Sequence, residues 1–181
     1  VFNAAFIPSY SSENLKKNKD GKKFADDVFN FLIVVLLAIV FLVEIFTPFF
    51  VYIIAPGFYD NPEKFDLSVQ LTRITFPFLF FVSLSSFFAA ILNSNNKFAA
   101  GAAAPIILNI FLILSLFISY LFNLNFVTNL SYAVSFAGFF QLLFLVFFSR
   151  KYYIPTINFK IKITQKVKFF LNKLLPSIFS S

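Results

Sequence analysis

Two ionisable side chains, Glu44 and Arg73, stand inside long apolar runs of the sequence. Glu44 lies near the middle of its run, and at ~1.5 Å of rise per residue a helix would place it near the bilayer centre. An ionised group there costs several kcal/mol unless it is paired, wetted or protonated. Glu44 is therefore a candidate for lining a polar cavity or forming a buried pair. A purely structural contact with a neighbouring helix, or a helix displaced far enough to wet the side chain, is the alternative.

Arg73 lies about two turns from the predicted boundary of its run. Its long side chain could extend to the lipid headgroups. Alternatively, it faces a central cavity and binds an anion through both arms of the guanidinium. We keep Arg73 beside Glu44 as a candidate substrate or cavity residue.

The sequence offers no constellation for catalysis. It contains no His and no Cys, which removes the commonest general base, the commonest metal ligands and the usual nucleophile pairs. Its four Gly are not grouped into a phosphate-binding loop. Asp60, Glu63 and Asp66 are close together, but they are typical of a solvated loop. We expect neither an enzyme nor a metal site or cofactor.

The elements that position these residues are predicted to be transmembrane helices. The chain is 59% hydrophobic and 13% charged, against about a quarter charged in soluble domains. Its apolar runs are each long enough to cross a bilayer as a helix, and they cover roughly Val28–Ile54, Leu67–Leu92, Phe98–Phe122 and Leu130–Ser149.

We therefore predict an all-α, polytopic transmembrane helix bundle, with four full spans between residues 28 and 149 and partial spans at both ends. Residues 1–10 would end a preceding helix, and residues 174–181 would begin a further one. The sequence has no Met, so we expect an internal fragment of a longer protein.

Further residues inside the runs suggest how the helices bend and pack. Pro48, Pro77 and Pro105 each remove a backbone hydrogen bond and are kink candidates. Asn109 and Gln141 are candidates for hydrogen bonds between helices, an interpretation we favour over substrate contact.

The basic residues set the orientation. If residues 11–27 form a cytoplasmic basic loop, then residues 150–173 form a second basic cytoplasmic or interfacial segment. This side then holds 13 of the 15 Lys and Arg residues: Lys16, Lys17, Lys19, Lys22, Lys23, Lys97, Arg150, Lys151, Lys160, Lys162, Lys166, Lys168 and Lys173. Such a bias is the orientation signal of a membrane protein. The net charge of +7 therefore indicates membrane lipid as a partner and does not indicate nucleic acid.

Several strings occur in a distinctive order along the chain. They are FNAAFIP at 2–8, IIAPGF at 53–58, LTRITFPFLFFVSLSS at 71–86, ILNSNNKFAA at 91–100 and AAAPIILN at 102–109. In this order they resemble the MurJ/MviN family, the bacterial lipid II flippases of the multidrug/oligosaccharidyl-lipid/polysaccharide exporter superfamily.

The resemblance implies an inner-membrane protein of cell-wall biosynthesis. It would move lipid II, the lipid-linked peptidoglycan precursor, between leaflets by alternating access of two lobes. It also implies that the chain runs from the end of the second helix to the start of the seventh, within the N-terminal lobe. The family's essential cavity arginines, mainly on the first, second and eighth helices, would lie outside it. Arg73 falls in the LTRITFP string, without a role carried over from the family.

Two other functions stay open on the sequence alone. One is a related exporter that moves another polyprenyl-linked glycan or a drug. The other is a membrane scaffold without a transport path, in which Glu44 and Arg73 would be structural.

Overall fold

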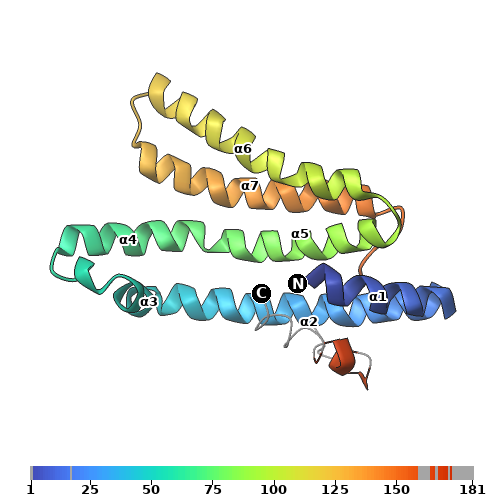
Figure 1. The fold of residues 1–181 in the computed structure, drawn as a ribbon. Coiled ribbons are helices and arrows are strands. Elements are labelled where there is room, and N and C mark those ends of the chain that lie inside the picture. The colour runs from blue at the N-terminus through green and yellow to red at the C-terminus, as the bar shows by residue number, and fades with distance from the viewer. Residues whose placement is uncertain (1, 17, 159–163, 166, 171, 173–181) are drawn as a thin grey trace. The chain divides into compact units, whose positions relative to one another are not determined.

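The computed structural model describes residues 2–16, 18–158, 164–165, 167–170 and 172, and within them it contains helices and no strand. The elements, in chain order (Figure 1), are α1 (Phe2–Lys16), α2 (Asn18–Ile45), α3 (Thr47–Ile54), the short 3-10 helix η1 (Pro56–Phe58), α4 (Pro62–Thr75), α5 (Pro77–Ser94), α6 (Phe98–Leu121) and α7 (Phe126–Ser149). The predicted all-α class is confirmed.

Four helical stretches of the described chain are long and apolar enough to cross a membrane. They are Asp20–Ile45, Pro62–Ser94, Phe98–Leu121 and Phe126–Ser149, of 24 to 33 residues each. A helix needs about 20 apolar residues to cross the hydrocarbon core. The chain is therefore a multi-pass membrane protein, as predicted. The partial span expected at residues 174–181 lies outside the described residues, as do residues 159–163, 166, 171 and 173 of the basic segment predicted at 150–173.

The basic stretch predicted as a loop at residues 11–27 is largely helical. Helix α1 continues to Lys16 and α2 begins at Asn18. Lys and Glu are good helix formers, and the stretch has no Pro and one Gly, so its own residues favour helix. Asp26 consequently lies inside α2.

The first two predicted spans are each interrupted next to a proline. Helix α2 ends at Ile45 and α3 begins at Thr47, followed by Pro48. Helix α4 ends at Thr75 and α5 begins at Pro77. In contrast, α6 continues through Pro105. Whether any of these prolines acts as a hinge stays a prediction.

Beside each break, a side-chain hydroxyl donates to a backbone carbonyl of the preceding turn. Pro48 has no N–H to donate to the carbonyl of Glu44, four residues earlier. The hydroxyl of Thr47, which is fully buried, lies 3.0 Å from that carbonyl and 2.7 Å from the carbonyl of Val43. At the second break, the hydroxyl of Ser135 on α7 donates to the carbonyl of Ile74.

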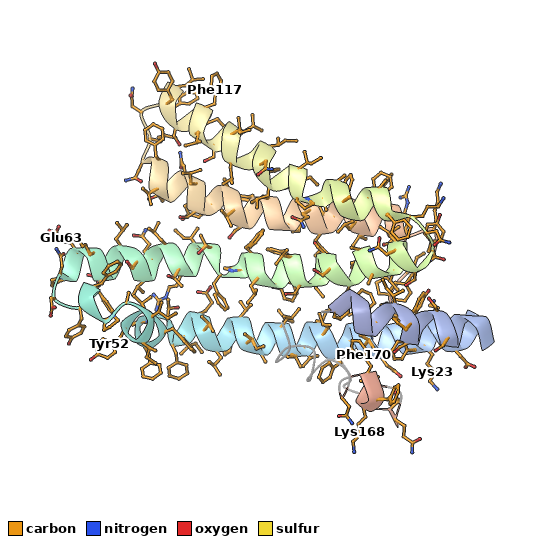
Figure 2. The ribbon with its side chains drawn as sticks, viewed as in Figure 1. Lys23, Tyr52, Glu63, Phe117, Lys168 and Phe170 are labelled. Atoms are coloured by element: carbon orange, nitrogen blue, oxygen red, sulfur yellow. The ribbon has the colours of Figure 1, made fainter. Side chains whose placement is uncertain are left out.

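The chain divides into two compact units. The first comprises residues 1–35, 83–104 and 142–181, and the second comprises 36–82 and 105–141. The core of the first unit is a cluster of aromatic rings. Phe6 contacts Phe87 and Phe24, with centroids 5.2 and 5.9 Å apart. Phe170 completes the cluster 6.1 Å from Phe6. Figure 2 shows Phe170 pointing toward α1 and α2, while Lys168 points away from them.

Hydrogen bonds also join the chain that follows α7 to α2 in the first unit. One carboxylate oxygen of Asp26 accepts hydrogen bonds from the Tyr153 hydroxyl at 2.7 Å and from the Thr156 amide at 3.0 Å. One turn further along α2, Asn30 donates to the carbonyl of Thr156 and accepts from the amide of Asn158. Burial, then the hydrogen bond to Asp26 and the nearby negative charges raise the pKa of Tyr153 well above its usual value.

The second unit depends on a close approach between α5 and α7. A Cβ atom at Gly138 would lie 2.6 Å from Cδ2 of Phe78 and 3.2 Å from Cβ of Phe81. Helix α6, in contrast, presents many large apolar side chains outward, as Phe117 illustrates (Figure 2). Such a surface suits lipid or further apolar helices.

We expect the substitution Gly138→Ala to destabilise the protein, because the Phe78 ring and the Phe81 backbone region must move to admit the methyl group. Overpacking of this kind costs about 1–3 kcal/mol. The matched control is Gly101→Ala, whose Cβ would meet nothing nearer than Ala89 Cβ at 3.4 Å. The melting temperature of the full-length protein in detergent measures both. Equal melting temperatures for the two variants would contradict the tight approach at Gly138.

We expect Tyr153→Phe to lower the free energy of unfolding by about 1.5–3 kcal/mol, because a hydrogen bond to a charged acceptor is lost. The neighbouring, exposed Tyr152→Phe is the control. The Tyr153 hydroxyl keeps its proton to higher pH in the folded protein than in the unfolded chain. Its contribution is therefore complete below pH about 10 and is lost as the pH rises toward the folded-state pKa. The difference between wild type and Tyr153→Phe should shrink accordingly in unfolding measured at increasing alkaline pH. A difference that persisted unchanged would contradict this assignment.

Candidate functional site

Glu44 lies in the second unit, near the C-terminal end of α2 and within the first predicted span. It is the second-last residue of α2, immediately before the break at Phe46. The residue is half-buried, and its Oε1 atom is fully buried without a hydrogen-bond partner. A buried carboxylate oxygen without a donor is costly, so this atom marks a position where a donor from outside the described residues would be stabilising.

Arg73 belongs to the same unit and occupies the last turn of α4. Its side chain is exposed, and its positive charge acts on Glu44 through space. Within the described residues the guanidinium does not satisfy the Glu44 Oε1 atom. The structure thus brings the two sequence-predicted residues into one unit as electrostatic neighbours, and leaves both with unused hydrogen-bonding capacity.

Arg73 also borders a cavity of about 490 Å³. Residues Ile74, Pro77 and Phe81 form one wall along the α4–α5 break. Tyr132, Ser135, Phe136 and Phe139 of α7 form the other. The cavity is an apolar, largely aromatic space with one guanidinium at its border. This arrangement can hold an amphiphile, with the apolar part against the rings and an anionic group at Arg73.

Ser135 and Tyr132 are the lining residues that the sequence reasoning missed. Ser135 does more than line the cavity, because its hydroxyl satisfies the Ile74 carbonyl beside Arg73. A signal for it was present: Ser131, Ser135 and Gly138 are small residues spaced so that they share one face of a helix. In membrane helices such a face marks a close approach to a neighbour.

The remaining candidates are not brought to this cavity. Gln141 is buried at the end of the second unit's part of α7. Asn109 is exposed on α6, as is Pro105. The roles of Asn109 and Gln141 in hydrogen bonds between helices stay predictions. Among the described residues, no group of His, Cys, Asp and Glu side chains is arranged to hold a metal ion.

Comparison of the sequence with known proteins identifies a family. A family model described as "Lipid II flippase MurJ" matches residues 1–181. The chain is 42% identical over 147 residues to the "Probable lipid II flippase MurJ" of Rhizobium tropici, covering 78% of this chain and 28% of that relative. It is 45% identical over 114 residues to the protein of the same description from Rickettsia prowazekii (strain Madrid E), covering 63% and 22%.

A more distant relative, the "Lipid II flippase MurJ" of Burkholderia cenocepacia, is 30% identical over 111 residues, covering 61% of this chain and 22% of that protein. The chain thus spans between a fifth and a third of the length of these relatives. Since the family model covers the chain from its first to its last residue, the chain belongs to the lipid II flippase MurJ family.

Proposed function

We propose that this chain is part of the N-terminal lobe of a lipid II flippase that works by alternating access across the bacterial inner membrane. The observation that carries the proposal is the match of the family model to the whole chain. The four spans and the interrupted helices support it. The protein moves its substrate without making or breaking covalent bonds, so it is a transporter and not an enzyme.

The physical task explains why such a lobe needs polar groups at membrane depth. The substrate carries a pyrophosphate and a sugar-peptide head, and neither can cross hydrocarbon unaided. A flippase supplies a polar path for the head while the prenyl tail stays in lipid. In this proposal, Arg73 and Glu44 belong to that path. Arg73 offers donors to an anion, and Glu44 Oε1, which lacks a donor among the described residues, accepts from water or from a group on the substrate.

The charge distribution supports one orientation of the lobe. Residues 11–27 and 150–173 would face the cytoplasm, and the connection that contains Lys64 would face the periplasm, in agreement with the positive-inside rule. The intervening residues 28–149 would then carry the four crossings. Lipid II, membrane lipid and no nucleic acid would be the partners.

A related exporter of another polyprenyl-linked glycan is the runner-up, because the same physical task would require the same kind of lobe. The family match favours lipid II. Nothing in the cavity next to Arg73 discriminates between head groups, since its only charged lining residue is the arginine itself.

Depletion of the full-length protein tests the proposal. In a strain without a redundant flippase, we expect lipid II to accumulate in the cytoplasmic leaflet, and expression of the intact protein to restore its transfer. Leaflet-specific labelling of lipid II measures the distribution. Normal transfer in the depleted strain would exclude lipid II flipping. If another lipid-linked glycan accumulated in its place, the runner-up would replace the proposal.

We expect Arg73→Gln to lower lipid II transfer by roughly ten- to a hundredfold, because an anion loses a charge-assisted hydrogen bond worth roughly 1.5–3 kcal/mol. Lys64→Gln is the matched control, since it removes one positive charge from an exposed position of the same helix. Transfer is measured at equal amounts of membrane-inserted protein. Equal transfer by both variants would show that Arg73 has no part in the path.

A third test measures whether water reaches the side chain of Glu44. In a cysteine-free full-length protein, we expect Glu44→Cys to react with a membrane-impermeant maleimide, because the thiolate forms only where water reaches it. Phe41→Cys on the same helix is the control. Phe41 is 69% exposed on an apolar face that suits lipid, so this variant should stay unlabelled. Inertness of the Glu44 variant in every conformational state would rule out a water-filled path at this residue.

A further inference from the structure

A second cavity lies in the first unit, where α6 begins and α7 ends. Its volume is about 840 Å³. One part of its wall is apolar and combines the small residues Ala99, Ala100 and Ala103 of α6 with phenylalanines of α7, among them Phe144 and Phe148. The other part carries three cations, Lys97, Arg150 and Lys151. The cavity therefore has an apolar end and a cationic end.

The cationic end continues into a smaller, more polar cavity of about 500 Å³. The two cavities share Arg150, Lys151 and Tyr152. The smaller one adds Lys22 and Asn95. Among the described residues, no Asp or Glu lines either cavity. An anion that entered this end would be attracted by all three cations.

Local structure explains why the cations gather there. Helix α5 ends in a turn in which Asn96 adopts a left-handed conformation, with φ of 57°. The amides of Asn96 and Lys97 donate to the carbonyls of Asn93 and Leu92, at 3.0 and 2.9 Å. This is the Schellman arrangement, and it directs the chain sharply from α5 into α6. Lys97 is thereby fixed at the first residue before α6.

The opposite wall is fixed by the end of α7. The amides of Tyr152 and Tyr153 both donate to the carbonyl of Ser149, at 2.8 and 2.9 Å, and so close the helix. The Arg150 guanidinium lies 4.1 Å from the centre of the Phe147 ring. Arg150 is thus held where the aromatic wall meets the polar end, and its donors remain available to an anion.

We propose that this cavity binds a resident anionic phospholipid. The phosphate lies among Lys97, Arg150 and Lys151, and an acyl chain lies along the groove between the alanines of α6 and the phenylalanines of α7. Basic pockets between transmembrane helices, on the side where Lys and Arg concentrate, suit phospholipid headgroups. Small residues on α6 leave room for a chain that larger side chains would fill.

The composition of the cavity favours a lipid over other occupants. A soluble phosphate would gain nothing from the apolar end, and an apolar helix of the same protein would leave three cations without partners. Both groups of residues are used together only by a molecule that is anionic at one end and apolar along its length. The site is separate from the Arg73 cavity in its residues, and it would exist whatever substrate the protein transports.

The test uses the full-length protein in lipid nanodiscs that contain phosphatidylglycerol and phosphatidylcholine, with retained phospholipid measured by native mass spectrometry. We expect the wild type to retain phosphatidylglycerol preferentially. The double variant Arg150→Gln/Lys151→Gln should retain about 25-fold less, at about fivefold per cation. The control Lys23→Gln/Lys64→Gln removes the same charge from exposed positions outside both cavities, and it should behave as the wild type does.

A second pair of variants tests the acyl groove. We expect Ala103→Phe to fill the groove and reduce retention, whereas Ala102→Phe, at an exposed position that does not line the cavity, should not. Melting temperatures measured without added lipid show whether each variant is folded. If the cation variant failed to fold, the Ala103 pair would still decide the question.

Three outcomes would overturn the proposal. Equal retention by the two double variants would show that the cations bind no lipid phosphate. Retention that was unaffected by Ala103→Phe and was displaced by millimolar glycerol 3-phosphate would identify a soluble-anion site. A cysteine at Ala103 that crosslinked to another segment of the full-length protein would show that protein covers the groove. Each outcome is independent of whether lipid II is transported.

Discussion

Every backbone N–H and C=O inside the hydrocarbon must find its partner within the protein, and the structure depends on this constraint. An unbroken helix meets it automatically, so each proline in a span creates a local deficit. Pro48 deprives the carbonyl of Glu44 of its partner, and Thr47 compensates with its hydroxyl. Near Pro77, Ser135 supplies a donor to the Ile74 carbonyl from a different helix. This second hydrogen bond joins α4 to α7 beside the break.

The two breaks coincide with the two ionisable residues in the spans. Glu44 is four residues before Pro48, and Arg73 is four residues before Pro77. In a helix, the carbonyl four residues before a proline is the one left without a backbone donor. Each charged side chain therefore extends from the turn whose backbone is least regular. Charged side chains and unpaired backbone carbonyls both require hydrogen-bond partners. Because they occur on the same turns, the groups that require partners are concentrated in one region of the second unit.

Features that depend on the bilayer could be predicted from the sequence. The all-α class and the four crossings follow from the length and composition of the apolar runs, because an apolar run of about 20 residues satisfies its own backbone in lipid as a helix. Pro48 and Pro77 lie beside the two interruptions, whereas α6 continues through Pro105. The helical state of residues 11–27 could not be predicted from the sequence, because a polar, lysine-rich stretch can form a solvated helix as easily as a loop. Helix α2 consequently begins earlier than the apolar pattern indicates.

Contacts between distant residues were beyond sequence reasoning. The positions of Asp26 and Tyr153 in the sequence do not predict the hydrogen bond between them, because 127 positions separate them. Ser135 was missed for the same reason, since its partner is 61 positions away. The sequence identified Arg73 and Glu44 as unusual because charge in an apolar run is costly wherever its partner lies. It could not say that the Glu44 oxygen would remain without a donor.

That unsatisfied oxygen argues for a site that other groups complete. A lobe built only for rigidity would gain by closing Arg73 onto Glu44, since a direct ion pair would satisfy the buried Oε1 atom. Instead, Arg73 is exposed and acts on Glu44 through space alone. Because the guanidinium always keeps its charge, its free donors favour an anion, while the carboxylate oxygen favours a donor. A substrate head that carries both kinds of group, or water that supplies both, removes the cost at the two residues together.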